Sequence, residues 1–267
     1  MKICILGSTG MLGSAVAKYF LNTEHDVLLT HRNKSVKIND DSLYFDALDY
    51  NFEMLKGCDY ILNCIGIIKP FMAEDVLKSI QINSIFPRRL ANFCKKNKIN
   101  LIHITTDCVF SGKDGDYDEN SLHDCLDDYG KSKSLGEPEN CMVLRTSIIG
   151  EEIHKNASLV EWAKTMRGKA VRGFVNHRWN GLTTKEYAKV CQQIIENNLY
   201  KEEIFHVFSP SAVNKYELMI MLDRKYNLKM KVEKFECKEA VDRTLTSCKK
   251  EMEAVTVAFL QRQIEEM

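Results

Sequence analysis

MKICILGSTGMLG, residues 1–13, sets the fold of this chain because an apolar run is followed at once by regularly spaced glycines. Residues 2–6 predict a buried strand, and residues 11–22 predict a helix because apolar side chains recur there at helical spacing. Glycine in such a turn lets the backbone approach a pyrophosphate, whose charge the helix N-terminus stabilises. The first gap is one residue wider than in the commonest dinucleotide fingerprint, and a turn without a ligand is the alternative. We expect a dinucleotide to bind at this turn, through Gly7, Thr9, Gly10, Met11, Leu12 and Gly13.

Short apolar runs alternate with helical segments through the first 150 residues, which predicts a parallel sheet flanked by helices. The expected strands span residues 2–6, 27–30, 43–45, 60–63, 101–105 and 142–145. A long helix is expected over residues 73–95, with Pro87 as the point where it could break. The fold class is therefore α/β, a Rossmann-type doubly wound parallel sheet.

The pattern changes after residue 150. Helices are expected over residues 158–167, 184–197, 215–226 and 249–265, with residues 168–183 irregular. No repeat and no Pro/Gly-rich linker separates the two halves. We expect residues 1–150 to form the dinucleotide-binding domain. Residues 151–267 should form mainly a smaller α/β lobe that binds substrate and is partly interleaved with that domain.

Charge and composition narrow the range of partners. Lys and Arg together number 37, as do Asp and Glu, so the formal net charge is zero, which argues against nucleic acid or an anionic membrane. No apolar run reaches the ~20 residues of a membrane-spanning helix. The ten cysteines include no Cys-x-x-Cys pair, and His123 with Cys125 has no second pair, so no metal site is expected. The lack of a secretory signal favours reduced thiols and a cytoplasmic location.

The end of the second expected strand bears on the choice of cofactor. Folds that prefer NAD usually present a carboxylate there to the ribose hydroxyls. This strand instead ends in His31-Arg32-Asn33, and Arg32 could pair with a 2′-phosphate. The sequence favours NADP(H), with NAD(H) as the alternative and an ordinary exposed role for Arg32 left open.

Tyr129 and Lys133 stand four residues apart in the segment YGKSK and so share one face of a helix. Reduction of a ketone requires a proton for the alkoxide that forms as hydride arrives, and tyrosine can supply it if its pKa approaches neutrality. A shift from ~10 to ~7 requires about 4 kcal/mol, which one ammonium ~4 Å away could provide. A tyrosine and a lysine four residues apart can occur by chance. This pair, however, follows the fifth expected strand of a chain that opens with a dinucleotide-binding loop, and that position favours a catalytic role.

Thr106 follows the fifth expected strand, where its hydroxyl could hydrogen-bond a substrate carbonyl. Thr105 is the neighbouring alternative, but strand alternation places its side chain on the other face. Each residue also has a structural alternative. Thr106 could form a turn, Tyr129 could be a half-buried packing residue, and Lys133 could be a solvated residue on the helix surface. Together, in this order along the chain, the three residues predict a hydride-transfer site.

The chain resembles the extended short-chain dehydrogenases/reductases, most closely the dTDP-4-dehydrorhamnose reductase family of sugar-nucleotide reductases. Within residues 1–190 the resemblance is carried by the glycine loop, NCIG at 63–66, TTDCVFSG at 105–112, YGKSK at 129–133, GE at 136–137, LRTS at 144–147 and NGLTT at 180–184. The Thr-Asp-x-Val-Phe-x-Gly part of the third segment is the most specific piece.

This resemblance implies roles for individual residues. Thr106, Tyr129 and Lys133 look like the catalytic triad, with Tyr129 as proton donor and Lys133 also binding the nicotinamide ribose. Asp46 and Ala47 look like the adenine contact, and Asp107 would face the sugar. The residues expected near the central riboses of the cofactor are Asn63, Cys64 and Ile65.

Two positions depart from the family pattern near the hexose. Cys108 stands where tyrosine is common, and Ile148 where an aromatic residue is common, so the sugar can differ from 4-keto-rhamnose. In the second half, Arg178 could pair with a substrate diphosphate and Trp179 could pack on a base or sugar, with Asn180 beside them. A core position for Trp179 is the alternative.

The sequence thus predicts NADPH-dependent reduction of the 4-keto group of a nucleotide-activated 4-keto-6-deoxysugar, for polysaccharide or glycan precursors. One alternative is a non-catalytic NADP-binding partner protein that resembles the regulatory subunit of methionine adenosyltransferase. Another is a sugar-nucleotide epimerase or dehydratase, although dehydratases need an acid–base pair such as Asp-Glu where this chain has Asp107 and Cys108. A homodimer is compatible with the sequence.

Overall fold

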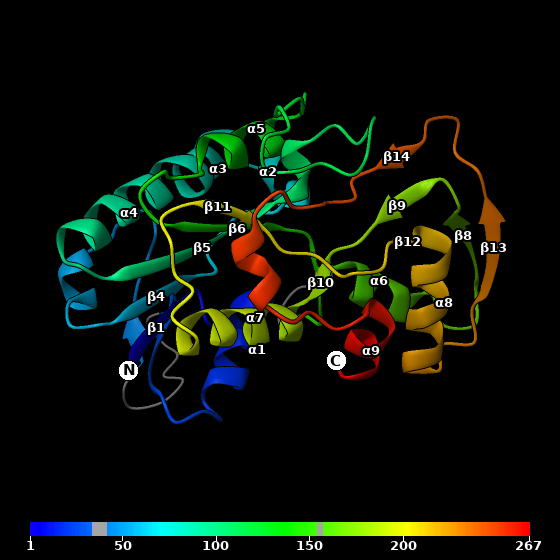
Figure 1. The fold of residues 1–267 in the computed structure, drawn as a ribbon. Coiled ribbons are helices and arrows are strands. Elements are labelled where there is room, and N and C mark those ends of the chain that lie inside the picture. The colour runs from blue at the N-terminus through cyan, green and yellow to red at the C-terminus, as the bar shows by residue number, and fades with distance from the viewer. Residues whose placement is uncertain (34–41, 154–156) are drawn as a thin grey trace.

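The main sheet of the molecule is a doubly wound Rossmann sheet. The computed structural model describes residues 1–33, 42–153 and 157–267. These residues form a seven-stranded sheet of order β11-β6-β5-β4-β1-β2-β3, in which all neighbouring strands are parallel. Strand order reverses at β1, where a Rossmann sheet binds its ligand. Figure 1 shows helices on both faces of this sheet and a smaller lobe beside it.

The strands of the main sheet agree with the sequence prediction within one residue at each end, except for the last. They are β1 (Lys2–Leu6), β2 (Asp26–His31), β3 (Leu43–Tyr44), β4 (Tyr60–Asn63), β5 (Asn100–Thr106), β6 (Met142–Thr146) and β11 (Ile204–His206). The prediction lacks β11 because three residues are too few to show a period.

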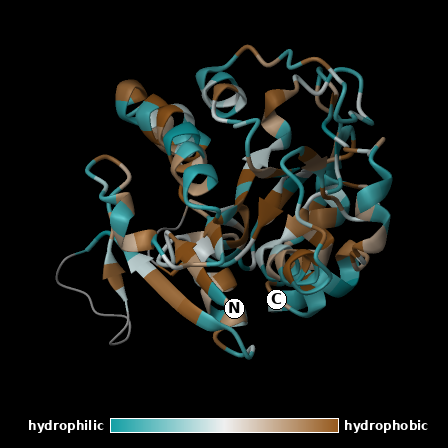
Figure 2. Cartoon of the chain, turned by 60° about the vertical axis from the view of Figure 1, so that its left-hand side comes forward, coloured by the Kyte–Doolittle hydropathy of each residue, from teal (hydrophilic) through white to brown (hydrophobic). Residues whose placement is uncertain are grey.

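Alternate side chains of each strand support helices on opposite faces. Ile3 and Ile5 of β1 join a core cluster with α1 and α7, whereas Cys4 and Leu6 join a second cluster with α4. Strands buried on both faces are nearly continuous apolar runs, which explains why the sequence predicts them well. Figure 2 shows hydrophobic strands enclosed by helices of mixed character. The helices around the sheet are α1 (Met11–Phe20), α2 (Lys69–Met72), α3 (Val76–Ile80), α4 (Phe86–Lys96), α5 (Asp128–Leu135) and α7 (Thr184–Glu196).

Pro87 does not break the long helical segment. α3 continues into a π-helical turn, η2 (Gln81–Ile85), and then into α4, with Pro87 in the first turn of α4. Proline lacks an N–H donor and its ring collides with the carbonyl of the preceding turn, so a wider turn before it removes the conflict.

Two of the sequence predictions for the smaller lobe are wrong. Residues 168–183 are not irregular, because β8, β9 and β10 lie there and pair with strands distant in sequence, which local periodicity cannot reveal. The helix predicted over residues 249–265 is two short helices, since the β-branched residues Val255, Thr256 and Val257 disfavour helix between them. The lobe contains β7 (Ile148–Ile149), α6 (Leu159–Thr165), β8 (Ala170–Phe174), β9 (His177–Trp179), β10 (Leu182–Thr183), β12 (Val213–Asn214), α8 (Lys215–Tyr226), β13 (Lys231–Phe235), β14 (Val241–Asp242) and α9 (Leu260–Glu265).

The second half of the chain is interleaved with the first. α7 packs against α1, and β11 pairs with β6 at the edge of the main sheet, so residues 184–206 return to the Rossmann unit before the chain re-enters the lobe. Short 3-10 turns complete the described structure: η1 (Phe52–Leu55), η3 (Asp107–Val109) and η4 (Lys250–Ala254). Over the described ranges, no helix has both the length and the apolar character needed to cross a membrane.

Candidate functional site

A groove of about 420 Å³ opens above the glycine loop at the carboxyl end of β1. Gly7 has a φ of +79°, which favours glycine, and a Cβ on Gly13 would lie 2.0 Å from the Gly7 carbonyl oxygen. Glycine is therefore required at both positions, at Gly7 by backbone conformation and at Gly13 by close packing of α1 on the loop. The predicted residues that line the groove are Gly7, Thr9, Gly10, Met11, His31, Arg32, Asp46, Ala47, Cys64 and Ile65.

Three of the predicted cofactor residues lie behind the groove wall. Leu12 is buried in the core under α1, and Gly13 packs against the loop backbone. Asn63 is buried, with its side-chain amide 3.0 Å from Nδ1 of His103 and its Oδ1 accepting the N–H of Ile65. Asn63 thus shapes the loop that carries Cys64 and Ile65, whose own atoms face the groove.

The shape and chemistry of the groove fit a dinucleotide. The first-turn N–H groups of α1 have no intrahelical acceptors and point toward the glycine loop, where a diphosphate would lie. Arg32 is exposed at the end of β2, and Asp46 accepts the N–H of Leu48 and so orders the turn beside it. The N–H groups at the start of α1 would hold the diphosphate. Arg32 would hold a phosphate on the ribose, and the turn at Asp46 would contact the adenine.

The catalytic candidates lie on α5 and at the end of β5. They do not line the groove themselves, but the Lys133 ammonium would lie 3.9 Å from a Cβ on Gly66, which does. Asp127 caps α5 by accepting the N–H of Gly130 at 2.9 Å, and this fixes the first turn, which carries Tyr129. One turn later, the Lys133 ammonium donates to the Ile104 carbonyl of β5 at 3.1 Å. Thr106 is near enough to Tyr129 to affect the pKa of its phenol. The structure therefore brings Thr106, Tyr129 and Lys133 together.

The position of α5 is set by very close packing on two sides. A Cβ on Gly130 would lie 2.3 Å from the Cys108 carbonyl oxygen, and one on Gly136 would lie 1.8 Å from that of Asn83. Asn83 and Ser84 belong to the π-helical turn η2, and both hydrogen-bond Ser132 of α5. The π turn that accommodates Pro87 therefore also presents polar groups to the catalytic helix.

Burial changes the pKa values of two of the catalytic candidates, Tyr129 and Lys133. It raises the pKa of Tyr129 well above the ordinary phenol value, and neighbouring Cys108 adds to this, while the Thr106 hydrogen bond opposes it. Burial also lowers the pKa of Lys133 to about 8, against the opposing effect of Glu137. The sequence predicts a fall of the Tyr129 pKa toward neutrality, and for the protein without cofactor this prediction is wrong. Tyr129 is instead fully protonated at neutral pH, which is the form that a proton donor requires.

The predicted substrate residues divide into two groups. Asp107 is buried beside Thr106, whose hydroxyl donates to its carboxylate at 3.1 Å, and Cys108 follows it. Ile148 is half-buried at the start of β7. Arg178, in contrast, is exposed and forms an ion pair with Asp242 at 3.0 Å.

Trp179 and Asn180 have structural contacts that the sequence did not specify. Trp179 is 4% exposed in the lobe core, the alternative left open above. Asn180 is buried and exchanges two hydrogen bonds with the backbone of Leu245. The prediction missed Arg243, which donates to the carbonyls of Phe110 and Ser111 shortly after Asp107, and Lys215, whose charge also acts on Asp107. They lie more than a hundred residues later in the chain, in segments without motif spacing, so only the fold reveals them.

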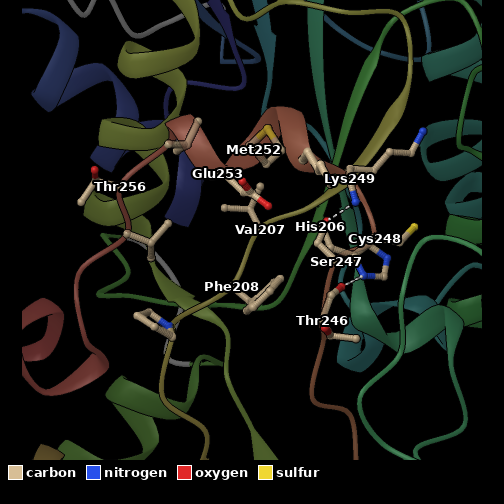
Figure 3. A pocket seen from close by; sticks show the side chains of 14 residues that line it. His206, Val207, Phe208, Thr246, Ser247, Cys248, Lys249, Met252, Glu253 and Thr256 are labelled. Atoms are coloured by element: carbon tan, nitrogen blue, oxygen red, sulfur yellow. Dashed lines mark hydrogen bonds between the residues drawn. The ribbon is translucent and has the colours of Figure 1, made fainter.

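A second pocket of about 610 Å³ lies between the segment after β11 and residues 246–257 (Figure 3). None of the site residues predicted from the sequence lines this pocket. On its wall, His206 lies beside Thr246 and Ser247. His206 accepts from the Arg145 guanidinium at Nε2 (2.7 Å), so its Nδ1 carries the proton and donates to the carbonyl of Thr246 (2.9 Å). His206 therefore ties residues 246–248 to the buried edge of the main sheet.

His206 should make the protein less stable in acid. Burial, reinforced by Arg145, lowers its folded-state pKa to about 4, whereas the unfolded chain takes up the proton near 6.5. Between these values the unfolded state binds more protons, so stability rises with pH, and acidification across this window should cost about 3 kcal/mol. Urea unfolding at a series of pH values measures this. His206→Gln keeps an acceptor for Arg145 and a donor for Thr246, and it should remove this component. An unchanged pH slope in the variant would contradict the assignment.

The Rossmann sheet, the glycine-lined groove and the Tyr129–Lys133 pair beside it define a protein of the extended short-chain dehydrogenase/reductase class. The chain belongs to the family described as the RmlD substrate binding domain, whose model matches residues 1–249. The resemblance drawn from the sequence is thereby confirmed.

Similarity to known proteins extends over most of the chain. Methionine adenosyltransferase 2 subunit beta of Danio rerio is 28% identical over 246 residues, covering 85% of this chain and 74% of the relative. The dTDP-4-dehydrorhamnose reductase of Aggregatibacter actinomycetemcomitans is 25% identical over 238 residues, covering 83% and 78%. The crystal structure of a dTDP-4-dehydrorhamnose reductase from Bacillus anthracis in complex with NADP has a TM-score of 0.80 at 17% identity, over 99% of this chain and 97% of that one. The last of these confirms the fold.

Proposed function

We propose that this protein reduces the 4-keto group of a nucleotide-activated 4-keto-6-deoxysugar with NADPH. The observation that carries the proposal is that Thr106, Tyr129 and Lys133 lie near one another, with Lys133 beside Gly66 of a groove that fits a dinucleotide. The relatives named as dTDP-4-dehydrorhamnose reductases support the choice of substrate class.

The side chains of the cluster have distinct tasks in this reaction. NADPH bound in the groove supplies the hydride. The Thr106 hydroxyl orients the carbonyl oxygen, and the protonated Tyr129 phenol transfers its proton to that oxygen as charge develops. The Lys133 ammonium, held at the Ile104 carbonyl, lies one turn from Tyr129 and stabilises the phenolate that remains.

The proposed reaction can be tested by following NADPH oxidation across a panel of nucleotide 4-keto-6-deoxysugars with dTDP, UDP, GDP and CDP as the nucleotide. NMR of the product then gives the configuration at C4. We expect turnover with at least one member of the panel. NADPH binding without oxidation by any of them would reject the proposal.

Arg32 should determine the preference for NADPH over NADH. Its exposed guanidinium lies at the end of β2 in the groove, where a 2′-phosphate would lie. Because a charge-assisted hydrogen bond contributes about 1.5–3 kcal/mol, Arg32→Ala should weaken NADPH binding by roughly 10- to 100-fold. NADH binding should change less than twofold. Titrations of both cofactors by fluorescence measure this, and equal losses for the two would show that Arg32 does not contact the 2′-phosphate.

A regulatory subunit is the second candidate function, because relatives of 28% identity are named as subunits of methionine adenosyltransferase. In that case the protein would bind NADP and an enzyme partner without turnover. Affinity capture from the native host that recovers one stoichiometric enzyme, together with an absence of reductase activity over the sugar panel, would favour this candidate. Turnover in the panel without a stoichiometric partner would favour the reductase.

A further inference from the structure

A buried histidine of the main sheet lies beside the strand that leads into the cofactor groove. His103 of β5 is fully buried, and in the pairing of β4 with β5 it stands opposite Asn63, the last residue of β4. The Asn63 side-chain nitrogen lies 3.0 Å from Nδ1 of His103, and its Oδ1 accepts the N–H of Ile65 at 3.2 Å. One side chain therefore joins His103 to Ile65, at the point where β4 ends and the groove begins.

The directions of these hydrogen bonds determine the protonation of the imidazole. Because Oδ1 of Asn63 faces a backbone N–H, its Nδ2 is the donor toward His103, and Nδ1 of His103 must be unprotonated to accept. Burial, reinforced by the charge of Lys133, lowers the pKa of His103 well below its ordinary value, which keeps the ring neutral. The proton therefore lies on Nε2, where no acceptor within the described ranges meets it in hydrogen-bonding geometry.

Packing alone does not account for a histidine at this position. A buried N–H without an acceptor is unfavourable, whereas a leucine would fill a similar space without any polar atom. What a leucine would lack is the Nδ1 acceptor that the Asn63 amide uses. Without this acceptor the amide is free to rotate, and its hydrogen bond to Ile65 is no longer fixed.

The loop that follows β4, residues 64–66, connects two parts of the cofactor site, and all three of its residues line the groove. On one side, a Cβ on Gly7 would lie 2.8 Å from Cγ1 of Ile65, so the loop packs tightly on the turn expected to bind the diphosphate. On the other side, a Cβ on Gly66 would lie 3.9 Å from the Lys133 ammonium. A shift of this loop would therefore change the groove at both places.

We propose that His103 is a positioning residue for the dinucleotide, because its Nδ1 fixes the Asn63 amide and thereby the loop of residues 64–66 that lines the groove. The proposal rests on the proposed function only for the choice of NADPH as the ligand. It assigns a role in cofactor binding to a residue that acts entirely through another side chain.

The test compares the NADPH dissociation constants of full-length variants by fluorescence titration, with urea unfolding to establish that each variant is folded. His103→Asn keeps an acceptor close to the place of Nδ1, whereas His103→Leu fills more of the space and has no acceptor. We expect His103→Leu to weaken NADPH binding by about 3- to 10-fold, the contribution of one hydrogen bond, and His103→Asn to stay within about twofold of the wild type. If His103 only packed, the order would be reversed, because asparagine leaves the larger cavity, and that order would overturn the proposal. His103→Val replaces His103→Leu in this comparison if the leucine variant does not fold.

Two further variants separate this link from general effects on β5. Thr105→Val removes a buried hydroxyl on the same face of the same strand, and it should leave the Kd for NADPH within about twofold of the wild type. Asn63→Ala breaks the link from its other end, so it should lose at least as much affinity as His103→Leu. Adding His103→Leu to Asn63→Ala should then cause less than a further twofold loss, because the histidine has nothing left to position.

Three results would overturn the proposal: a Kd within twofold of the wild type in His103→Leu, full additivity in the double variant, or a wild-type protein that does not bind NADPH. The experiment needs no sugar and no turnover, so its outcome is separate from that of the proposed reaction. Variants that lose NADPH affinity as expected, in a protein that reduces no 4-keto sugar, would overturn only the proposed reaction.

Discussion

Replacing Tyr129 with phenylalanine should reduce kcat by about 100- to 10,000-fold, the range that a general acid contributes. The phenol lies beside Thr106, and burial raises its pKa, so it is protonated at neutral pH and can act as the acid. The ring itself would remain, so packing at the start of α5 and binding of NADPH should be preserved. Steady-state kinetics with the best sugar of the panel and a fluorescence titration of NADPH measure the two quantities separately.

The control for this experiment is Tyr50→Phe. Tyr50 accepts a hydrogen bond from Arg89 on the outside of the molecule, so its loss removes a phenol hydroxyl without touching the site. Its kcat should equal that of the wild type. A Tyr129→Phe variant that keeps kcat within threefold would exclude Tyr129 as the proton donor. Loss of NADPH binding together with kcat would indicate a structural role instead.

The parts of this site that the sequence predicts are those whose partners are close in the chain or set by regular geometry. Gly7 and Gly13 flank one turn, and Tyr129 and Lys133 are one helical turn apart, so strand and helix periodicity place them. The prediction that Thr106 lies at the end of the fifth strand succeeds because β5 is buried on both faces and is visible as an apolar run.

The remaining parts depend on contacts between distant segments. β8 pairs with β13, about sixty residues later, and neither strand is long or strongly alternating, so the sequence predicts an α/β lobe but does not locate its strands. Arg243 reaches the loop after β5 only because the segment that follows β14 folds back toward it. The acidity of Tyr129 was misjudged for a related reason. Helical spacing gives the position of Lys133, but burial of the phenol, which dominates its pKa, depends on the entire fold.

Glu137→Gln should lower the free energy of unfolding by about 3–5 kcal/mol, the cost of removing one partner from a buried ion pair. Glu137 accepts two hydrogen bonds from Arg145, at 3.1 and 2.7 Å, and both residues are almost fully buried. Arg145 also donates to His206 and His123, but neither histidine carries a negative charge that could balance the guanidinium. The variant would therefore leave an uncompensated guanidinium between β6 and β11. Urea unfolding at pH 7 measures the loss.

The matched control is Glu139→Gln, the same change two residues later at an exposed position, which should cost less than about 0.5 kcal/mol. A double variant, Glu137→Leu with Arg145→Met, removes both charges and should be more stable than Glu137→Gln alone, because no charge is left without a partner.

The position of Glu137 directly after α5 adds a functional consequence. Glu137 opposes the lowering of the Lys133 pKa, so the double variant should hold Lys133 at a lower pKa than the wild type and lose kcat at a lower pH as the ammonium is deprotonated. Equal stability of Glu137→Gln and Glu139→Gln would show that the buried pair does not hold the catalytic helix to the sheet.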